Sequence, residues 1–185
     1  EYGIRGFLDS YNAASGELEW RTHTIPGPDH PDNQTWAGES WRTGGSPTWI
    51  TGAYDPDLNL VYWGTGPPAP LPETLRGAGN ADLLYTNSTL ALDPDTGEMM
   101  WYFQHLPRDN WDLDHVFERM IVETDVSPNP ANVPWISPNL RPGETRKVIT
   151  GIPGKTGLVW TLDAATGEVE VRAEAEAGRT VGVAR

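Results

Sequence analysis

The sequence contains no cysteine, no long apolar run and little positive charge, and each absence excludes a class of protein. Without cysteine there is no disulfide framework, no thiolate metal site and no cysteine nucleophile. No apolar run approaches the roughly 18–20 residues of a membrane-spanning helix, so no membrane span is expected in this chain. The formal net charge is −13, from 13 Lys and Arg against 26 Asp and Glu. That balance argues against nucleic acid as a partner, because binding to phosphate backbones needs clustered Lys and Arg.

Tryptophan, glycine and proline are abundant instead. The 185 residues include nine Trp, 20 Gly and 17 Pro. Frequent Gly and Pro divide a chain into short elements. The apolar runs between them are short, aromatic and β-branched, which is typical of strands and not of amphipathic helices. The composition and the pattern together predict an all-β protein.

One motif occurs three times along the chain. Residues 10–20, 91–101 and 161–171 share a small residue, Asp or Asn, then Ser/Thr-Gly, and a closing Trp that Val171 replaces in the last copy. Each copy predicts a strand, a tight turn and a return strand, with the Asp or Asn side chain capping the turn and Gly at positive φ. The Trp is expected to pack on the return strand. Residues 53–63 form a looser relative.

The hairpins recur at about 40 residues or twice that, which is typical of four-stranded propeller blades with insertions. The alternative is a set of unrelated hairpins in a sandwich, but turn residues and Trp recur in register. We expect a partial β-propeller of about two to three blades over residues 1–171 and an atypical C-terminal tail over 172–185. The chain starts at Glu1, without Met or a signal peptide, which indicates a piece of a longer protein and leaves its location open.

The densest polar cluster is residues 107–115. In a strand or turn, Asp112 and Asp114 share one face. Adjacent carboxylates repel unless a cation lies between them or one is protonated, so the pair suits a hard metal ion or a base beside one. A solvated acidic turn is the alternative. His115 is expected at the surface or behind the site, because no second His stands at ligand spacing.

Two glycine-containing segments are further candidates. In residues 43–49, Gly-Gly precedes Trp49, which permits close approach of a flat ligand to the indole. The alternative is a turn into a strand with a core Trp. Around Lys155, three glycines resemble a phosphate loop, but their spacing fits neither the Walker pattern nor the dinucleotide fingerprint.

Taken in order, these motifs resemble the quinoprotein alcohol dehydrogenases, periplasmic bacterial enzymes with an eight-bladed propeller around pyrroloquinoline quinone. The repeats are similar to that family's tryptophan-docking motifs. Residues 1–7 resemble the strand that supplies a metal-binding glutamate, which implies Glu1 as a ligand. Trp49 matches the indole beneath the quinone ring, and Lys155 matches the cation beside the quinone oxygens.

The same resemblance makes residues 109–114 the catalytic motif. It implies that Asp112 is the catalytic base and a metal ligand, and that Asp114 is the extra aspartate ligand of lanthanide-dependent members. Pro67 stands where the family has an Asn ligand, and proline offers no side-chain oxygen. A backbone carbonyl, another side chain or water fills that place, or the metal site is impaired.

The resemblance therefore implies oxidation of a small alcohol to an aldehyde with pyrroloquinoline quinone and Ca²⁺ or a lanthanide ion as cofactors. Electrons would pass to a c-type cytochrome or a fused haem domain, and the location would be periplasmic. Two alternatives stay open: a degenerate, non-catalytic relative, suggested by Pro67, and an envelope scaffold propeller. A scaffold would lack the set of Glu1, Trp49, Asp112 and Lys155.

Overall fold

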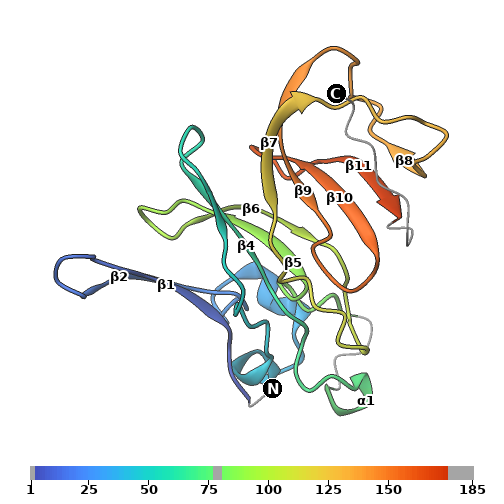
Figure 1. Cartoon of the computed structure of the whole chain (residues 1–185). Helices are drawn as coiled ribbons and strands as arrows, with labels where there is room; N and C mark the ends of the chain where they lie inside the picture. The colour runs from blue at the N-terminus through green and yellow to red at the C-terminus, as the bar shows by residue number, and fades with distance from the viewer. Residues whose placement is uncertain (1–2, 77–80, 175–185) are drawn as a thin grey trace.

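The structure, a computed structural model, describes residues 3–76 and 81–174. These residues form three antiparallel sheets that lie side by side (Figure 1). The first sheet is a hairpin of β1 (Phe7–Tyr11) and β2 (Leu18–His23). The second is a four-stranded meander of β3 (Ala53–Asp55), β4 (Leu60–Gly64), β5 (Ser88–Leu92) and β6 (Met99–Gln104).

The third sheet has the strand order β7-β9-β10-β11-β8. Its members are β7 (Met120–Asp125), β8 (Trp135–Ile136), β9 (Thr145–Gly151), β10 (Leu158–Asp163) and β11 (Val169–Glu174). Without the short edge strand β8, this sheet repeats the meander of the second. The described residues thus contain two four-stranded blades and one further hairpin, which confirms the all-β partial propeller.

The turn chemistry of the three repeats is confirmed. Oδ1 of Asn12 accepts hydrogen bonds from the amides of Ala14 and Ser15, both at 3.0 Å. Asp93 and Asp163 cap the equivalent turns through Oδ1. The motif glycines adopt positive φ, as a tight turn at these positions requires: Gly16 at 75°, Gly97 at 74° and Gly167 at 74°.

The repeat tryptophans connect neighbouring sheets. Nε1 of Trp20, on β2, donates to the Pro94 carbonyl at 2.8 Å, in the turn of the second sheet. Nε1 of Trp101, on β6, donates to the Ala164 carbonyl at 3.2 Å, in the turn of the third. Each Trp therefore lies on its own return strand but docks on the repeat turn of the next sheet.

Apolar clusters fill the spaces between the sheets. One joins the second and third sheets and includes Leu60, Tyr62, Ile149 and Leu162, all at most 7% exposed. Another joins the first hairpin to the second sheet through Leu8 and residues of β5. At roughly 25 cal/mol per Å² of apolar surface removed from water, such burial is the main force that holds successive sheets together.

A polar contact reinforces the junction of the second and third sheets. Nζ of Lys147, on β9, lies 3.0 Å from Oδ1 of Asp55 and 2.6 Å from Oδ2 of Asp57, in the β3–β4 turn. The hydroxyl of Tyr62 donates to the Ala164 carbonyl at 2.9 Å. These bonds fix the relative position of the two sheets at the end of β4 that is remote from Gly64.

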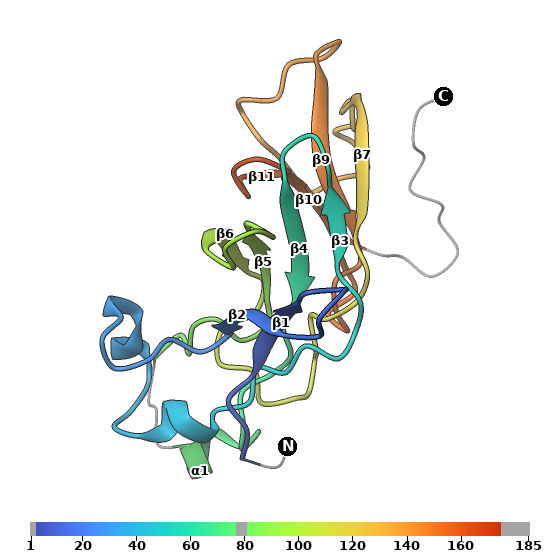
Figure 2. The same cartoon turned by 90° about the vertical axis from the view of Figure 1, so that its left-hand side faces the viewer.

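Several irregular segments from the N-terminal half of the chain gather at one end of the sheets, at the bottom of Figure 2. They include the 3-10 turns η1 (Pro31–Thr35) and η2 (Ser40–Thr43) and the single helical turn α1 (Glu73–Arg76). A third apolar cluster of Ile25, Trp36, Trp41 and Leu83 packs beneath them. The sheets are therefore a rigid base, and the loops at this end can carry a site.

Two predictions concern the part of the chain that the structure describes. Within residues 3–76 and 81–174, no helix is long and apolar enough to cross a membrane. Strand β11 continues through Glu174, and residues 175–185 of the predicted tail lie outside the described residues. The division of the chain at 171 therefore stays a prediction.

Candidate active site

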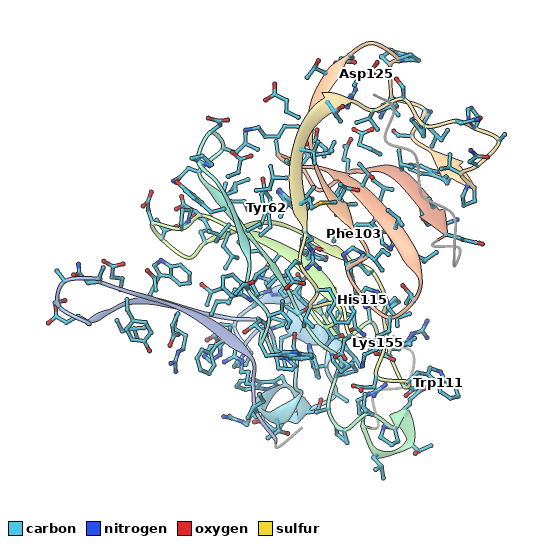
Figure 3. The ribbon with its side chains drawn as sticks, viewed as in Figure 1. Tyr62, Phe103, Trp111, His115, Asp125 and Lys155 are labelled. Carbon is cyan, nitrogen blue, oxygen red and sulfur yellow. The ribbon has the colours of Figure 1, made fainter. Side chains whose placement is uncertain are left out.

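Two loops from different parts of the chain meet at the loop-bearing end of the sheets. One follows β6 and carries residues 107–115, and the other joins β9 to β10 and carries Lys155. Figure 3 shows Lys155 between His115 and Trp111, far from Asp125. The amide of Lys155 donates to the Leu113 carbonyl at 2.8 Å. A β-carbon at Gly154 would lie 2.0 Å from the Asp114 carbonyl oxygen, so only glycine allows this approach.

The Lys155 ammonium group binds both predicted carboxylates. Its Nζ atom lies 2.5 Å from Oδ2 of Asp114 and 3.2 Å from Oδ2 of Asp112, and it donates to the Asp112 carbonyl at 2.8 Å. The hydrogen bond to Asp114 is the largest cause that raises the pKa of Lys155. The lysine therefore stays charged and offsets part of the repulsion between the two carboxylates.

Asp114 and Asp112 differ in their surroundings. The Asp114 side chain is 7% exposed and that of Asp112 is 46% exposed. Burial raises the pKa of Asp114, and the hydrogen bond from Lys155 opposes that change. Among the residues the structure describes, Oδ1 of Asp114 is buried without a hydrogen-bond partner. An unpartnered buried carboxylate oxygen is costly, and a hard cation would satisfy it.

Trp49 lies in the loop before β3 and is 54% exposed. Gly66, after the end of β4, packs against its ring: a β-carbon there would lie 2.7 Å from Cζ3 of Trp49. At the other side of the same segment, a β-carbon at Gly64 would lie 2.5 Å from the His115 carbonyl oxygen. The segment 64–66 thus connects the exposed indole to the loop that carries Asp112 and Asp114. An open ring face suits a flat ligand.

The residues that could hold a metal ion are only partly described. Glu1 lies outside the described residues. Across residues 3–76 and 81–174, no group of three or more His, Asp or Glu side chains is close enough to bind one ion. Asp112 and Asp114 supply carboxylate oxygens, and the free Oδ1 of Asp114 fits a hard cation. Pro67 is buried and adds none, and its carbonyl accepts the Ser46 amide at 3.0 Å.

His115 is fully buried, so the expectation of a surface position is wrong. The alternative expectation, a position behind the site, is consistent with its burial directly after Asp114. Its ring stacks on His105 with centroids 5.1 Å apart and an interplanar angle of 7°. Burial, and next the Arg119 charge, lower the pKa of His115 to about 4. Nη2 of Arg119 donates to the His115 carbonyl at 2.7 Å. The pair therefore packs as uncharged rings.

Three buried residues around the loop had no predicted role, although Asp109 lies within the predicted catalytic motif. Asp109, Asn87 and Arg76 are 2%, 0% and 7% exposed. Nδ2 of Asn87 donates to Oδ2 of Asp109 at 3.0 Å, and Nη1 of Arg76 donates to the Asp109 carbonyl at 3.0 Å. Asp109 had a local signal, because it caps a turn as the repeat aspartates do. The other two had none, because they lie 22 and 33 residues away in sequence.

Comparison with known proteins decides the family. The family model described as "Glucose/ethanol/alcohol dehydrogenase, beta-propeller domain", with the label PQQ, matches residues 2–177. The chain belongs to the family of pyrroloquinoline-quinone-dependent alcohol dehydrogenases. It is 36% identical over 180 residues to the quinohemoprotein alcohol dehydrogenase ADH IIB of Pseudomonas putida. The alignment covers 91% of this chain and 24% of the relative.

Two proteins named as methanol dehydrogenases are also similar over most of the chain. Subunit 1 of the cytochrome c methanol dehydrogenase of Methylorubrum extorquens is 33% identical, over 90% of this chain and 27% of the relative. A solved structure titled europium-containing methanol dehydrogenase superposes with a TM-score of 0.74 at 28% identity, over 91% of this chain and 29% of that one. The chain thus spans about a quarter of the length of these quinoprotein dehydrogenases.

Proposed function

We propose that these residues are part of an eight-bladed enzyme that oxidises a small alcohol to an aldehyde with pyrroloquinoline quinone. The observation that carries the proposal is the meeting of Asp112, Asp114 and Lys155 at the loop-bearing end of a partial quinoprotein propeller. A positioned carboxylate can accept a hydroxyl proton, and a fixed cation can stabilise negative charge that develops nearby. When bound, the quinone supplies the hydride acceptor and a Ca²⁺ or lanthanide ion supplies Lewis acidity.

Asp112 is the proposed base. Its side chain is half-exposed, so a substrate hydroxyl can reach it. Of its two carboxylate oxygens, Lys155 contacts Oδ2. Oδ1 is therefore the oxygen that we assign to the proton of the alcohol. Lys155 holds this carboxylate in place through its ammonium group and through its bond to the Asp112 carbonyl.

Trp49 and Lys155 are the proposed cofactor-binding residues. The exposed indole of Trp49 offers a flat apolar surface for a planar ring, and Gly66 supports it from behind. The Lys155 ammonium group would supply positive charge beside the oxygens of a bound quinone. Together they would orient the ring relative to Asp112, and fixed orientation is a large part of catalysis.

Glu1, Asp112 and Asp114 are the proposed metal ligands. The unpartnered Oδ1 of Asp114 supports the last of these assignments. A trivalent ion needs ligands with more negative charge than Ca²⁺ does, and Asp114 supplies an additional carboxylate beside Asp112. At Pro67 the expected side-chain ligand is missing, and a backbone carbonyl, another side chain or water would take its place.

The electron acceptor is proposed to be a c-type cytochrome or a fused haem domain, and the location periplasmic. Relatives named as quinohemoprotein and as cytochrome c methanol dehydrogenase support this partner class. A formal net charge of −13 would favour encounter with a basic cytochrome. Pro67 supports the competing proposal, a degenerate relative that binds the quinone without turnover.

The test is alcohol-dependent reduction of a dye by the complete protein, reconstituted with pyrroloquinoline quinone and either Ca²⁺ or La³⁺. We expect turnover of small primary alcohols, faster with La³⁺ than with Ca²⁺. In the Asp114→Ala variant the advantage of La³⁺ should disappear, because the additional carboxylate is gone. Equal or higher activity with Ca²⁺ in the unmodified protein contradicts the lanthanide assignment. Bound quinone without turnover under either metal supports the degenerate relative.

A further inference from the structure

The carboxylate of Asp109 binds three N–H groups around the candidate active site. Oδ1 accepts the Trp111 amide at 2.7 Å, and Oδ2 accepts the Leu113 amide at 2.7 Å and Nδ2 of Asn87 at 3.0 Å. The residue is 2% exposed, so no solvent competes for these bonds. The two amides belong to the residues directly before and after Asp112.

Asp112 has an unusual backbone conformation that these bonds hold. Its φ is 60°, in the left-handed region that residues other than glycine seldom adopt. Such a conformation persists where the surrounding structure imposes it. The Leu113 amide lies in the peptide group that follows Asp112, and the Trp111 amide lies in the peptide group before Trp111. With both amides fixed on one carboxylate, the two ends of the Trp111–Asp112 segment have little freedom. The side chain of Asp112 is thereby directed toward Lys155.

The turn is anchored to the rest of the molecule as well. Asn87 directly precedes β5, so its bond to Asp109 ties the turn to the second sheet. Nη1 of Arg76 donates to the Asp109 carbonyl at 3.0 Å, and Nη2 donates to Oδ1 of Asn110 at 3.0 Å. Because Lys155 binds the Leu113 carbonyl through its own amide, the turn and the lysine share one frame.

We propose that Asp109 is a positioning residue: its carboxylate holds the 110–113 turn so that Asp112 faces Lys155 and the substrate. This inference rests on the proposed function, in which Asp112 is the base. Asp109 itself contacts neither substrate nor cofactor in this proposal. Its contribution is geometric, and displacement of a catalytic group by about 1 Å can cost roughly 100-fold in rate.

The test compares Asp109→Asn with Asp55→Asn in the complete protein. The Asn side chain at 109 keeps the shape but replaces one acceptor oxygen with an NH₂ group, which cannot accept from Trp111 or Leu113. Asp55 is the matched control: it is 1% exposed and caps the β3–β4 turn by accepting the amides of Asp57 and Leu58. That turn is at the end of β4 remote from the site (Figure 1).

Two readouts are measured: hydrogen exchange of the Trp111 and Leu113 amides, and the rate of alcohol oxidation per bound quinone. In Asp109→Asn, we expect exchange to rise about tenfold at whichever of the two amides faces the new NH₂ group, as loss of one hydrogen bond implies. The rate per bound quinone should fall roughly 100-fold. Asp55→Asn should change neither. If Asp109→Asn does not accumulate as folded protein, Asn87→Ser takes its place and should shift both readouts in the same direction.

Unchanged exchange at the two amides, or faster exchange with an unchanged rate per quinone, overturns the positioning role. A fall in quinone occupancy alone, with the rate per bound quinone preserved, also overturns it, because that result reports only stability. If the unmodified protein shows no turnover at all, the proposed function fails. In that case faster exchange in Asp109→Asn alone still supports the conclusion that Asp109 fixes the turn.

Discussion

His115 is a titratable residue that its surroundings keep uncharged. Its folded pKa is about 4, against about 6.5 in an unfolded chain, because burial and the Arg119 charge disfavour the imidazolium. Between these values the unfolded chain binds a proton that the folded chain does not. The contribution of His115 to stability is therefore complete above about pH 6.5 and is lost as the pH falls toward 4. His105 acts in the same direction, since burial also lowers its pKa.

A His115→Phe variant tests this linkage. Neither ring nitrogen of His115 has a hydrogen-bond partner among the described residues, so an apolar ring removes the titration without leaving a polar group unpaired. From pH 7 to pH 5, the unfolding free energy of the unmodified protein should fall by about 2 kcal/mol more than that of the variant. Chemical denaturation followed by tryptophan fluorescence measures both. Parallel pH dependences would contradict the assignment.

At the scale of residues, the sequence carries information on the loop where the interacting side chains are close in sequence, and the roles assigned to them stay predictions. Asp112 and Asp114 were expected on one face, and both carboxylates contact the same ammonium group, although the segment is a turn with Asp112 at a φ of 60° and not an alternating strand. The sequence could not show that His115 is buried, because its stacking partner and Arg119 act only in the folded chain. Nor could it show that Asn87 is buried and binds Asp109, because the neighbouring residues Ser88 and Thr89 carry no information on burial.

At the scale of elements, the repeat turn combines two requirements in one glycine. Gly97 has a φ of 74°, and a β-carbon there would also lie 2.6 Å from Cδ2 of Trp20. Gly16 has nearly the same φ, 75°, but no described atom lies within 4 Å of its β-carbon position. Comparing alanine substitutions at Gly16 and Gly97 therefore distinguishes the cost of backbone strain from the cost of displacing the docked Trp20 ring.

We expect Gly16→Ala to destabilise the complete protein by about 1–2 kcal/mol, the cost of the left-handed conformation for a residue with a β-carbon. Gly97→Ala should cost about 1–3 kcal/mol more, because the Trp20 ring must move. Unfolding free energies from chemical denaturation give both values. Equal losses in the two variants would show that Trp20 does not dock tightly on this turn.

The elements themselves were predictable because the capping Asp or Asn and the glycine lie within a few residues of each other. The partner of each Trp was not: Trp20 and Pro94 are 74 residues apart, and Trp101 and Ala164 are 63 apart. Similarly, Asn59 takes a positive φ of 50° in the β3–β4 turn, where the looser repeat has no glycine. That substitution explains why this hairpin matched the motif less well.

At the scale of the whole molecule, the described sheets stack as successive blades of an incomplete ring. Buried apolar clusters and the docked tryptophans join each sheet to the next, so the loops at one end have a rigid base. The loops after β6 and after β9 meet there and bring Asp112 to Lys155, which is 43 residues away in sequence. The family resemblance implied that both residues belong to one site, but their direct contact is visible only in the structure.

The most direct test of the proposed function is a single turnover of the complete, quinone-loaded protein. Under anaerobic conditions, a primary alcohol is added and the absorbance of the bound quinone is followed in the unmodified protein and in Asp112→Asn. With equal quinone occupancy, the unmodified protein should show rapid reduction, and the variant should be slower by roughly 100- to 10,000-fold, the usual contribution of a general base. Reduction at the same rate in both proteins would contradict the assignment of Asp112 as the base.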